Sequence, residues 1–260
     1  MPDKRKRSSS SVERAFELLD VVAGTGISGA TLSDLARATG MAVSTCHRYV
    51  TALLDVGALR KDPSGQFFIG LKLVMLIGAS LETNTLRTLA RSQLEHLALV
   101  SGETVHLGQI CDQGVVYVDK IDSDQTVRLV SRIGSVAPLY CTAMGKAMLA
   151  VMSPDERAPH LAVATEVRTP HTLTGIALDK ELELVARRRW AIDEQENEDG
   201  VRCIGAAITS EQGELLGALS VSGPASRFTR EMCADLAPTI LKATDSIAHQ
   251  ASWPHIIDNL

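Results

Sequence analysis

The sequence predicts a two-domain chain of mixed α/β (α+β) structure, in which a small helical domain precedes a larger domain that contains a sheet. Apolar residues at helical spacing recur three times in the first sixty residues, and capping boxes open the first two of these segments. Beyond residue 102, segments rich in Val, Ile and Leu fall into two groups, with helical segments between and after them. This order is typical of an antiparallel sheet with helices against its faces. The 260 residues suffice for two separate cores.

We divide the chain into an arm, a first domain, a linker helix and a second domain. Residues 1–9 are charged and rich in serine, so we expect a flexible basic arm. The first domain then covers residues 10–70, the linker helix residues 71–85 and the second domain residues 86–255. Residues 1–70 hold nine Lys and Arg against seven Asp and Glu, a net +2 in a chain of −5. A basic N-terminal region in an otherwise acidic chain favours a domain that contacts nucleic acid.

The composition excludes several classes of protein. No apolar stretch approaches the length that spans a bilayer, and no apolar run follows the basic N-terminus as it would in a secretory signal. The five cysteines are scattered and lack CxxC spacing, which favours a reducing compartment over a disulfide framework. We therefore expect a cytoplasmic protein with no membrane partner.

Three short helices are predicted in the first domain. Capping boxes at Ser10–Glu13 and Thr31–Asp34 open the first two helices, and the third runs from about Ala42 to Val56. The expected buried positions of the first and third helices are Val12, Ala15, Phe16, Leu19, Val22, Val43, Cys46, Val50, Leu53 and Leu54.

The third helix also has a polar face near its N-terminal half, formed by Ser44, Thr45, His47, Arg48 and Thr51. Hydroxyl, imidazole and guanidinium groups in this position suit phosphates and base edges when a helix enters the major groove of DNA. The plain alternative is the solvated face of a small helical bundle.

A tight hairpin directly follows this helix. Residues 58–69 form two short strands around an Asp-Pro-Ser-Gly turn, with Arg60 and Lys61 at the base. Two helices, a polar third helix and a hairpin in such a short span indicate a winged helix-turn-helix that reads double-stranded DNA. The candidate DNA contacts are Arg14, Thr31, Ser44, Thr45, His47, Arg48, Thr51, Arg60 and Lys61.

The linker helix carries apolar residues on more than one face between Leu71 and Leu81. One face is enough to pack on its own domain, so the others predict contact with a second chain. One winged helix covers only a short half-site, and two chains related by a two-fold axis therefore suit an operator. We expect at least a dimer.

The second domain is predicted to alternate strands and helices. The expected strands are Glu103–Cys111, Val115–Ile121, Thr126–Ser131, Ala191–Glu196, Cys203–Thr209 and Leu215–Ser222. The expected helices are Ala143–Met152, a short helix capped by Ser153, Asp179–Trp190 and Thr229–Ala251.

Two features of this domain suit a small carboxylic acid. The helix that begins near Ala143 presents free backbone amides, which bind carboxylates, and Gly145 lets a ligand approach the backbone. Ser220 and Ser222 are two apart on a strand and share a face. The same residues also fit a simple threonine cap with a glycine for packing, and two solvated hydroxyls. Aromatic residues are few nearby, with Tyr140 as the main candidate for stacking.

Several short motifs run in collinear order over roughly residues 10–250 and together resemble the IclR family of bacterial transcriptional regulators. These motifs are Ser11–Arg14, Leu35–Gly40, Ser44-Thr45 with Arg48, Leu71–Leu73, Gly102–Gly108, Val116–Ile121, Pro138–Lys146, Asp199–Ile204 and Leu219–Pro224. The resemblance implies a winged-helix domain, a linker helix and a GAF-like effector-binding domain. It also implies dimers that pair into tetramers on operators with inverted-repeat character.

The resemblance further implies an effector site and an effector class. It assigns effector contacts to Leu129, Ala143, Met144, Asp193, Cys203, Ser220 and Ser222, and the helix-start argument adds Gly145. Within the family the chain looks closest to the repressors of pectin and uronate catabolism, which respond to 2-keto-3-deoxygluconate. We therefore expect a repressor that a small carboxylic acid of the sugar-acid type releases from its operator.

Two positions depart from the family pattern. Arg189 stands where family members often have a glycine before an aromatic residue, and a non-glycine residue in a left-handed turn costs on the order of 1 kcal/mol. The Gly205-Ala-Ala207 segment lacks the proline that is usual nearby. We expect the turn at Arg189, and the pocket wall beside it, to differ from those of relatives.

Catalysis is the main alternative class of function. The acidic run 194–199 offers acid and base groups, and Cys141 or Cys203 a nucleophile. Acidic runs are more often solvated loops, however, and lone cysteines are usually inert. A metal held by Asp193, Cys203 and His106 has no specific spacing to support it. We expect no catalytic residue, metal or cofactor.

Two alternatives stay open. The first is a regulator of the same family that senses a glyoxylate-like or aromatic acid. The second is a GAF-type enzyme with a vestigial winged helix. Release of DNA during titration with each acid distinguishes the sugar-acid regulator from the first alternative. Turnover of 2-keto acids would favour the enzyme.

Overall fold

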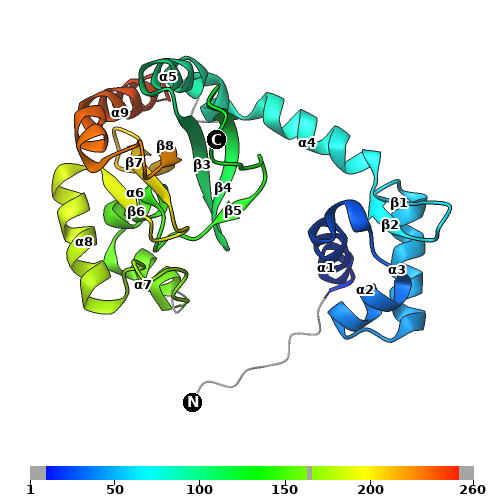
Figure 1. The fold of residues 1–260 in the computed structure, drawn as a ribbon. Coiled ribbons are helices and arrows are strands. Elements are labelled where there is room, and N and C mark those ends of the chain that lie inside the picture. The colour runs from blue at the N-terminus through cyan, green and yellow to red at the C-terminus, as the bar shows by residue number, and fades with distance from the viewer. Residues whose placement is uncertain (1–9, 163–165, 252–260) are drawn as a thin grey trace. The chain divides into compact units, whose positions relative to one another are not determined.

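The computed structural model describes residues 10–162 and 166–251, and its contacts divide the chain between Thr83 and Asn84 into two compact units (Figure 1). The predicted arm, residues 1–9, lies outside the described residues, as do residues 252–255 of the predicted second domain. Helices form the first unit together with a small hairpin, and a mixed α/β arrangement with an antiparallel sheet forms the second. The predicted fold class is confirmed.

The first unit is built as its caps predict. Ser10 and Glu13 bond reciprocally at the start of the first helix, Thr31 and Asp34 do so at the second, and left-handed Gly40 ends the second. The elements are α1 (Ser11–Gly24), the 3₁₀ turn η1 (Gly26–Ser28), α2 (Leu32–Thr39), α3 (Val43–Asp55), β1 (Leu59–Lys61), β2 (Phe67–Ile69) and α4 (Leu71–Thr83).

The core of the first unit corrects part of the predicted apolar stripes. Val12 and Phe16 are 65% and 60% exposed, whereas Leu18 is fully buried. The helix is rotated so that Leu18, Leu19 and Val22 face inward, and the two residues at the edge of the stripe reach solvent. Val43, the first residue of α3, is also exposed, because the core covers the helix only from Cys46 onward.

The second unit is a six-stranded antiparallel sheet in the order β5-β4-β3-β8-β7-β6. The strands are β3 (Thr104–Cys111), β4 (Gly114–Ile121), β5 (Val136–Ala137), β6 (Ala191–Glu194), β7 (Val201–Thr209) and β8 (Leu215–Pro224). The helices are α5 (Thr85–Ser101), α6 (Ala143–Val151), α7 (Pro154–Ala162), α8 (Gly175–Arg188) and α9 (Arg230–Ala251).

The two faces of this sheet carry different side chains. Helices α5 and α9 cover one face, where Val105, Leu107, Ile204 and Leu219 form an aliphatic core (Figure 1). Helices α6 and α8 cover the other face, which holds Val115 and Ala218 but also several polar residues. Because strand residues alternate between faces, the polar positions of β3, β7 and β8 gather under α6.

Two predicted strands need correction, and one helix was missed. Residues 126–131 form no strand: they belong to an irregular segment in which Val127 and Val130 are 66% and 82% exposed, so nothing covers an apolar face there. The predicted strand at 191–196 ends at Glu194, because Gln195 takes a left-handed conformation with φ of 61°. Helix α5 was not predicted, although Leu86, Ala90, Leu94 and Leu97 give it a buried stripe.

Within the described ranges, no helix combines the length and the apolar character needed to cross a membrane.

Candidate functional site

The polar face of α3 is open to solvent. Ser44, His47, Arg48 and Thr51 are exposed and Thr45 is half-buried, while Cys46 and Val50 on the opposite side lie in the core. The Thr51 hydroxyl donates to the carbonyl of His47 at 2.9 Å, so its proton is already engaged within the helix. Ser44, His47 and Arg48 present their polar groups outward.

The hairpin places its two cations over aromatic rings. The Arg60 guanidinium lies 4.4 Å from the centroid of the Phe68 ring, and the Lys61 ammonium lies 5.4 Å from that of Phe67. Both side chains are exposed and lie along the hairpin, which orders them without neutralising them.

Arg14 and Thr31 are half-buried, unlike the exposed polar residues of α3. The Thr31 hydroxyl donates to the Asp34 carboxylate at 2.6 Å and caps α2. Arg14 is half-buried on α1. The outward face of α3 and the hairpin cations are the more exposed part of the predicted contact surface, and Arg14 and Thr31 stay predicted contacts.

The second unit contains a small cavity, about 30 Å³ in volume, between the start of α6, the sheet and the loop after β6. Seven of the eight predicted effector residues line it, Gly145 being the exception. The lining residues are Tyr117, Leu129, Thr142, Ala143, Met144, Asp193, Asn197, Glu198, Val201, Cys203, Ser220 and Ser222.

The start of α6 lies directly on the sheet. A Cβ at Gly205 of β7 would stand 2.7 Å from the Ala143 carbonyl carbon and the Met144 nitrogen, so only glycine allows this approach. The capping hydroxyl of Thr142 accepts from the Gly145 amide at 3.1 Å. The first-turn amides of Ala143 and Met144 are therefore the donors that a ligand can use.

Gly145 serves packing in this arrangement. A Cβ on it would meet the backbone of Leu139 at 2.2 to 2.6 Å, so the missing side chain allows the chain before α6 to pack closely. The alternative reading of this glycine, a packing residue beside a threonine cap, fits this geometry.

The strand register sets the polar residues in two rows across the sheet. Asp193, Cys203, Ser222 and Thr104 are successive partners on β6, β7, β8 and β3. Gly205, Ser220, His106 and Lys120 form the next row, on β7, β8, β3 and β4. Residues of both rows line the cavity.

Asp193 is the buried acid of the cavity, 2% exposed. Its Oδ1 accepts from the backbone amides of Glu196 at 2.7 Å and Asn197 at 3.3 Å, so it also holds the loop after β6. Burial raises the pKa of this carboxyl to about 7, while those amides and Lys146 act against the shift. Among the residues that the structure describes, no Lys or Arg lines the cavity.

A buried ion pair supports the cavity wall. Lys146 of α6 is fully buried and pairs with Glu196, itself 2% exposed, in the loop after β6. The Thr169 and Thr172 hydroxyls both donate to the Glu196 carbonyl, at 3.3 and 2.7 Å. The loop that carries Asn197 and Glu198 is thus tied to α6.

Sequence reasoning missed Tyr117, Thr142 as a lining residue, Asn197, Glu198 and Val201. Tyr117 is the aromatic residue of the cavity, whereas Tyr140 donates its hydroxyl to the Glu166 carbonyl at 2.9 Å and lies outside it. The alternation of β4 contained a signal for Tyr117, because it follows buried Val115 on the same face.

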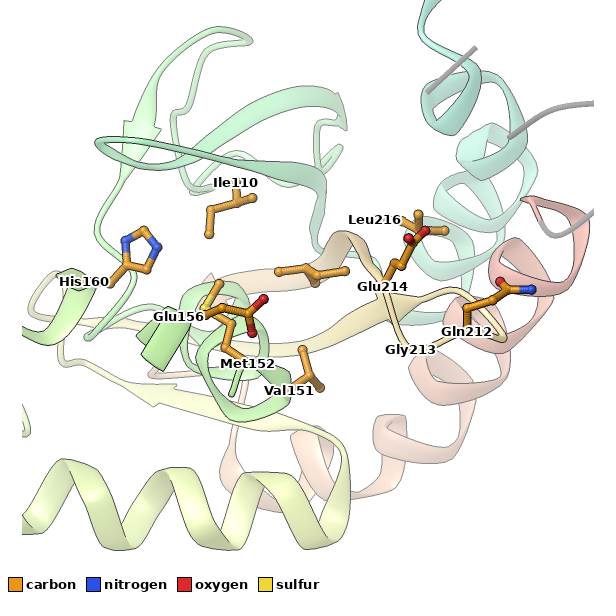
Figure 2. Close-up of a pocket in the computed structure, with 10 residues that line it drawn as sticks. Ile110, Val151, Met152, Glu156, His160, Gln212, Gly213, Glu214 and Leu216 are labelled. Carbon is orange, nitrogen blue, oxygen red and sulfur yellow. The ribbon is translucent and has the colours of Figure 1, made fainter. Parts of the chain in front are cut away.

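A wider cavity of about 700 Å³ lies at the turn between β7 and β8, against the end of α6 and α7 (Figure 2). Its walls include Ile110, Met152, His160 and two acids, Glu156 and Glu214. Hydrogen bonds from Ser153 lower the pKa of Glu156, which stays charged. None of the predicted residues lines this cavity.

Among the described residues, no three His, Cys, Asp or Glu side chains are arranged to hold a metal ion.

The sequence matches two family models in the order of the two units. Residues 11–63 match the IclR helix-turn-helix domain, and residues 78–249 match the bacterial transcriptional regulator IclR C-terminal domain. The second match alone covers more than half of the chain. The chain belongs to the IclR family. It is therefore a transcriptional regulator with a DNA-binding and an effector-binding domain.

Relatives of this IclR-family chain include named regulators, one of them of a glycerol operon. It is 32% identical to the regulator KdgR of Escherichia coli, over 96% of each chain. It is also 32% identical to the glycerol operon regulatory protein of Streptomyces griseus, over 89% of this chain and 90% of that one. The crystal structure of Thermotoga maritima IclR is 30% identical, with a TM-score of 0.71 over 94% and 99% of the two chains. The first two of these relatives are named as regulators.

Proposed function

We propose that the chain represses genes of sugar-acid catabolism and leaves its operator when the cavity binds a small carboxylic acid such as 2-keto-3-deoxygluconate. The observation that carries this proposal is the cavity itself, where helix-start amides, two serine hydroxyls and a buried acid converge. The similarity to KdgR over nearly the whole chain supports the same effector class.

The proposed binding mode follows from the chemistry of these groups. The carboxylate of the ligand accepts from the amides of Ala143 and Met144 at the positive end of α6. The hydroxyls of Ser220 and Ser222, 3% exposed each, exchange hydrogen bonds with the hydroxyls and keto group of the ligand. Asp193, when protonated, adds a donor to the same set.

One observation favours a smaller acid as a second candidate. The cavity of about 30 Å³ holds a water or two, not a six-carbon acid. Glyoxylate enters such a space with little rearrangement, whereas 2-keto-3-deoxygluconate requires the cavity to open. An aromatic acid would have Tyr117 as its stacking partner.

We propose that DNA recognition uses the outward face of α3, with Arg48 and Ser44 at its N-terminal half and the hairpin cations on the phosphates. Two chains, paired through the exposed apolar side chains of α4, would present two such helices to an inverted repeat. Dimers that associate further would give a tetramer. Light scattering that finds only monomer at micromolar concentration would contradict the pairing.

The test is release of DNA by defined acids. An operator duplex is first selected from random DNA with purified protein, and its binding is followed by fluorescence anisotropy. We expect 2-keto-3-deoxygluconate to weaken binding by about 5- to 150-fold, the usual range of allosteric coupling. Glyoxylate and protocatechuate serve as the competing acids. If either acts in place of the sugar acid, the regulator assignment stands and the effector assignment fails.

A further inference from the structure

His106 lies beside the effector cavity without lining it. It sits on β3 directly opposite Ser220 of β8, and its ring stacks on that of Tyr117 with centroids 4.7 Å apart. Ser220 and Tyr117 both line the cavity. The imidazole is therefore the next polar group after Ser220 in this row of the sheet, one strand beyond the proposed serine contacts.

The two ring nitrogens of His106 are used unequally. Nε2 makes a 2.7 Å hydrogen bond with the Ser131 hydroxyl, while Nδ1 is buried and has no hydrogen-bond partner among the described residues. Burial lowers the pKa of the ring to about 4, so it is neutral at pH 7 and holds one donor and one acceptor. Among the described residues, the hydrogen bond between Nε2 and Ser131 is therefore the one that holds the ring.

The segment of residues 122–135 covers this histidine. The Ser123 hydroxyl donates to the Gly102 carbonyl at 2.6 Å at one end, and the Gly134 amide donates to the Tyr117 carbonyl at 2.8 Å at the other. Between these ends, Ser131 bonds to His106, and its carbonyl accepts from Lys120 Nζ at 2.7 Å. Leu129, two residues before Ser131, lines the cavity. The segment thus contacts both the cavity, through Leu129, and His106, through Ser131.

The strand spacing gives the length of an enlarged site. The start of α6 lies over Gly205, and His106 is two strands away through Ser220, roughly 10 Å at about 4.8 Å per strand. An extended six-carbon acid with its terminal oxygens has seven bonds, roughly 8 Å at the reach per bond of a backbone. With a hydrogen bond at its far end, such a ligand spans from the α6 amides to His106, and a two-carbon acid does not.

We propose that His106 is a specificity-determining residue that hydrogen-bonds the far hydroxyl of a long polyhydroxy acid once the ligand displaces Ser131 from it. This inference rests on the proposed function, because it requires a ligand held by its carboxylate at α6. Without a ligand, the Ser131 hydroxyl bonds to His106 in the place that the ligand hydroxyl takes. When the ligand binds, the segment 122–135 moves to enlarge the cavity.

The test compares ligand lengths in two variants of the full chain by calorimetry. His106→Phe keeps a ring against Tyr117 and removes both nitrogens, so affinity for 2-keto-3-deoxygluconate should fall by about tenfold, the effect of one lost hydrogen bond. Ser131→Ala removes the competing hydroxyl, so the same affinity should rise severalfold. Glyoxylate affinity should change in neither variant. Ser135→Ala, an exposed serine of the same segment, is the matched control.

The outcomes separate the two proposals. If wild-type protein binds no sugar acid, the proposed function fails and this inference fails with it. If wild-type protein binds 2-keto-3-deoxygluconate but Ser131→Ala and His106→Phe bind it equally well, only the role of His106 is overturned. Equal losses for both acids in His106→Phe, together with no gain in Ser131→Ala, would mean that the histidine only supports the fold. Ser131→Ala keeps the test open if His106→Phe does not fold.

Discussion

The outward face of α3 and the cavity under α6 are made of similar residues in opposite surroundings. Ser44, His47 and Arg48 are exposed on a helix whose other side is core, whereas Ser220, Ser222 and Asp193 are 2–3% exposed on a sheet. Replacing a polar side chain at the surface costs the fold little stability, whereas a buried polar group that loses its partner destabilises the fold. Changes on α3 should therefore affect binding alone, and changes around the cavity should affect binding and stability together.

The largest expected effect tests the buried side of this contrast. Lys146→Met leaves Glu196 buried without its partner, and we expect a loss of about 3–5 kcal/mol in the free energy of unfolding. The double variant Lys146→Met/Glu196→Gln should recover most of that loss. Urea denaturation of both variants measures the difference. A single variant as stable as wild type would show that the pair does not support the cavity wall.

The second test uses the charge of Asp193. The folded-state pKa of about 7 lies above the unfolded value, so the folded state binds more protons between about pH 4 and 7 and loses stability as pH rises through that window. Asp193→Asn stays neutral and keeps an acceptor for the loop amides. We expect it to be more stable than wild type at pH 8, by at most about 4 kcal/mol, and equal at pH 4. Melting curves at the two pH values measure this, and a variant that is less stable at pH 8 would contradict the prediction.

The exposed side of the contrast is tested on α3. Arg48→Ala should weaken operator binding by about 1–3 kcal/mol and leave the melting temperature unchanged, since its side chain is exposed. Lys72→Ala, an exposed cation on α4, is the control for general charge. If Ser44→Ala, Thr45→Ala and Arg48→Ala together leave affinity unchanged, α3 is not the recognition helix.

A fourth prediction links the cavity to pH. An anionic effector enters a site that has no Lys or Arg in its lining and that gains the Asp193 charge above about pH 7. We expect effector affinity to fall by up to about fivefold from pH 7 to pH 8 in wild type, and to change little in Asp193→Asn. Calorimetry of wild type and Asp193→Asn at both pH values measures these affinities. Affinity that rises with pH would mean that the charged carboxylate of Asp193 is the binding form.

The smallest effect lies at an exposed turn that leads into the cavity. Arg189 adopts the left-handed conformation, φ 68°, between α8 and β6. Arg189→Gly should stabilise the fold by about 1 kcal/mol. Its ion pair with Asp245 is exposed on both sides and contributes little. Asp245→Ala, which breaks the pair alone, is the control, and a destabilised Arg189→Gly would mean that the pair outweighs the backbone strain.

Local rules explain what could be predicted in the first unit. The two capping boxes, Gly40 and the hairpin turn depend on neighbours in the sequence, and each was found there. Arg189, which stands where family members often have a glycine, takes the left-handed form. The chain tolerates the side chain there because it points to solvent.

The candidate site was less accessible to local reasoning. Family resemblance supplied seven of the cavity residues, but nothing in the sequence marks Lys146 and Glu196 as buried among many exposed charges. The register that brings Tyr117 beside His106 depends on a bulge between Leu107 and Gly108. Residues 126–131 look like a strand by composition, and only the absence of a covering face excludes it.

Helix α4 buries none of its thirteen residues in its own chain, and Leu71, Val74, Met75, Leu76 and Ile77 are each more than half exposed. Once two chains pair through this helix as proposed, the species that occupies the operator is the product of a second-order reaction. While single chains predominate, its concentration follows the square of the total amount of protein. The rate at which a cell makes this chain then acts as a second input, and a modest drop in synthesis would relieve the proposed repression as the proposed effector would.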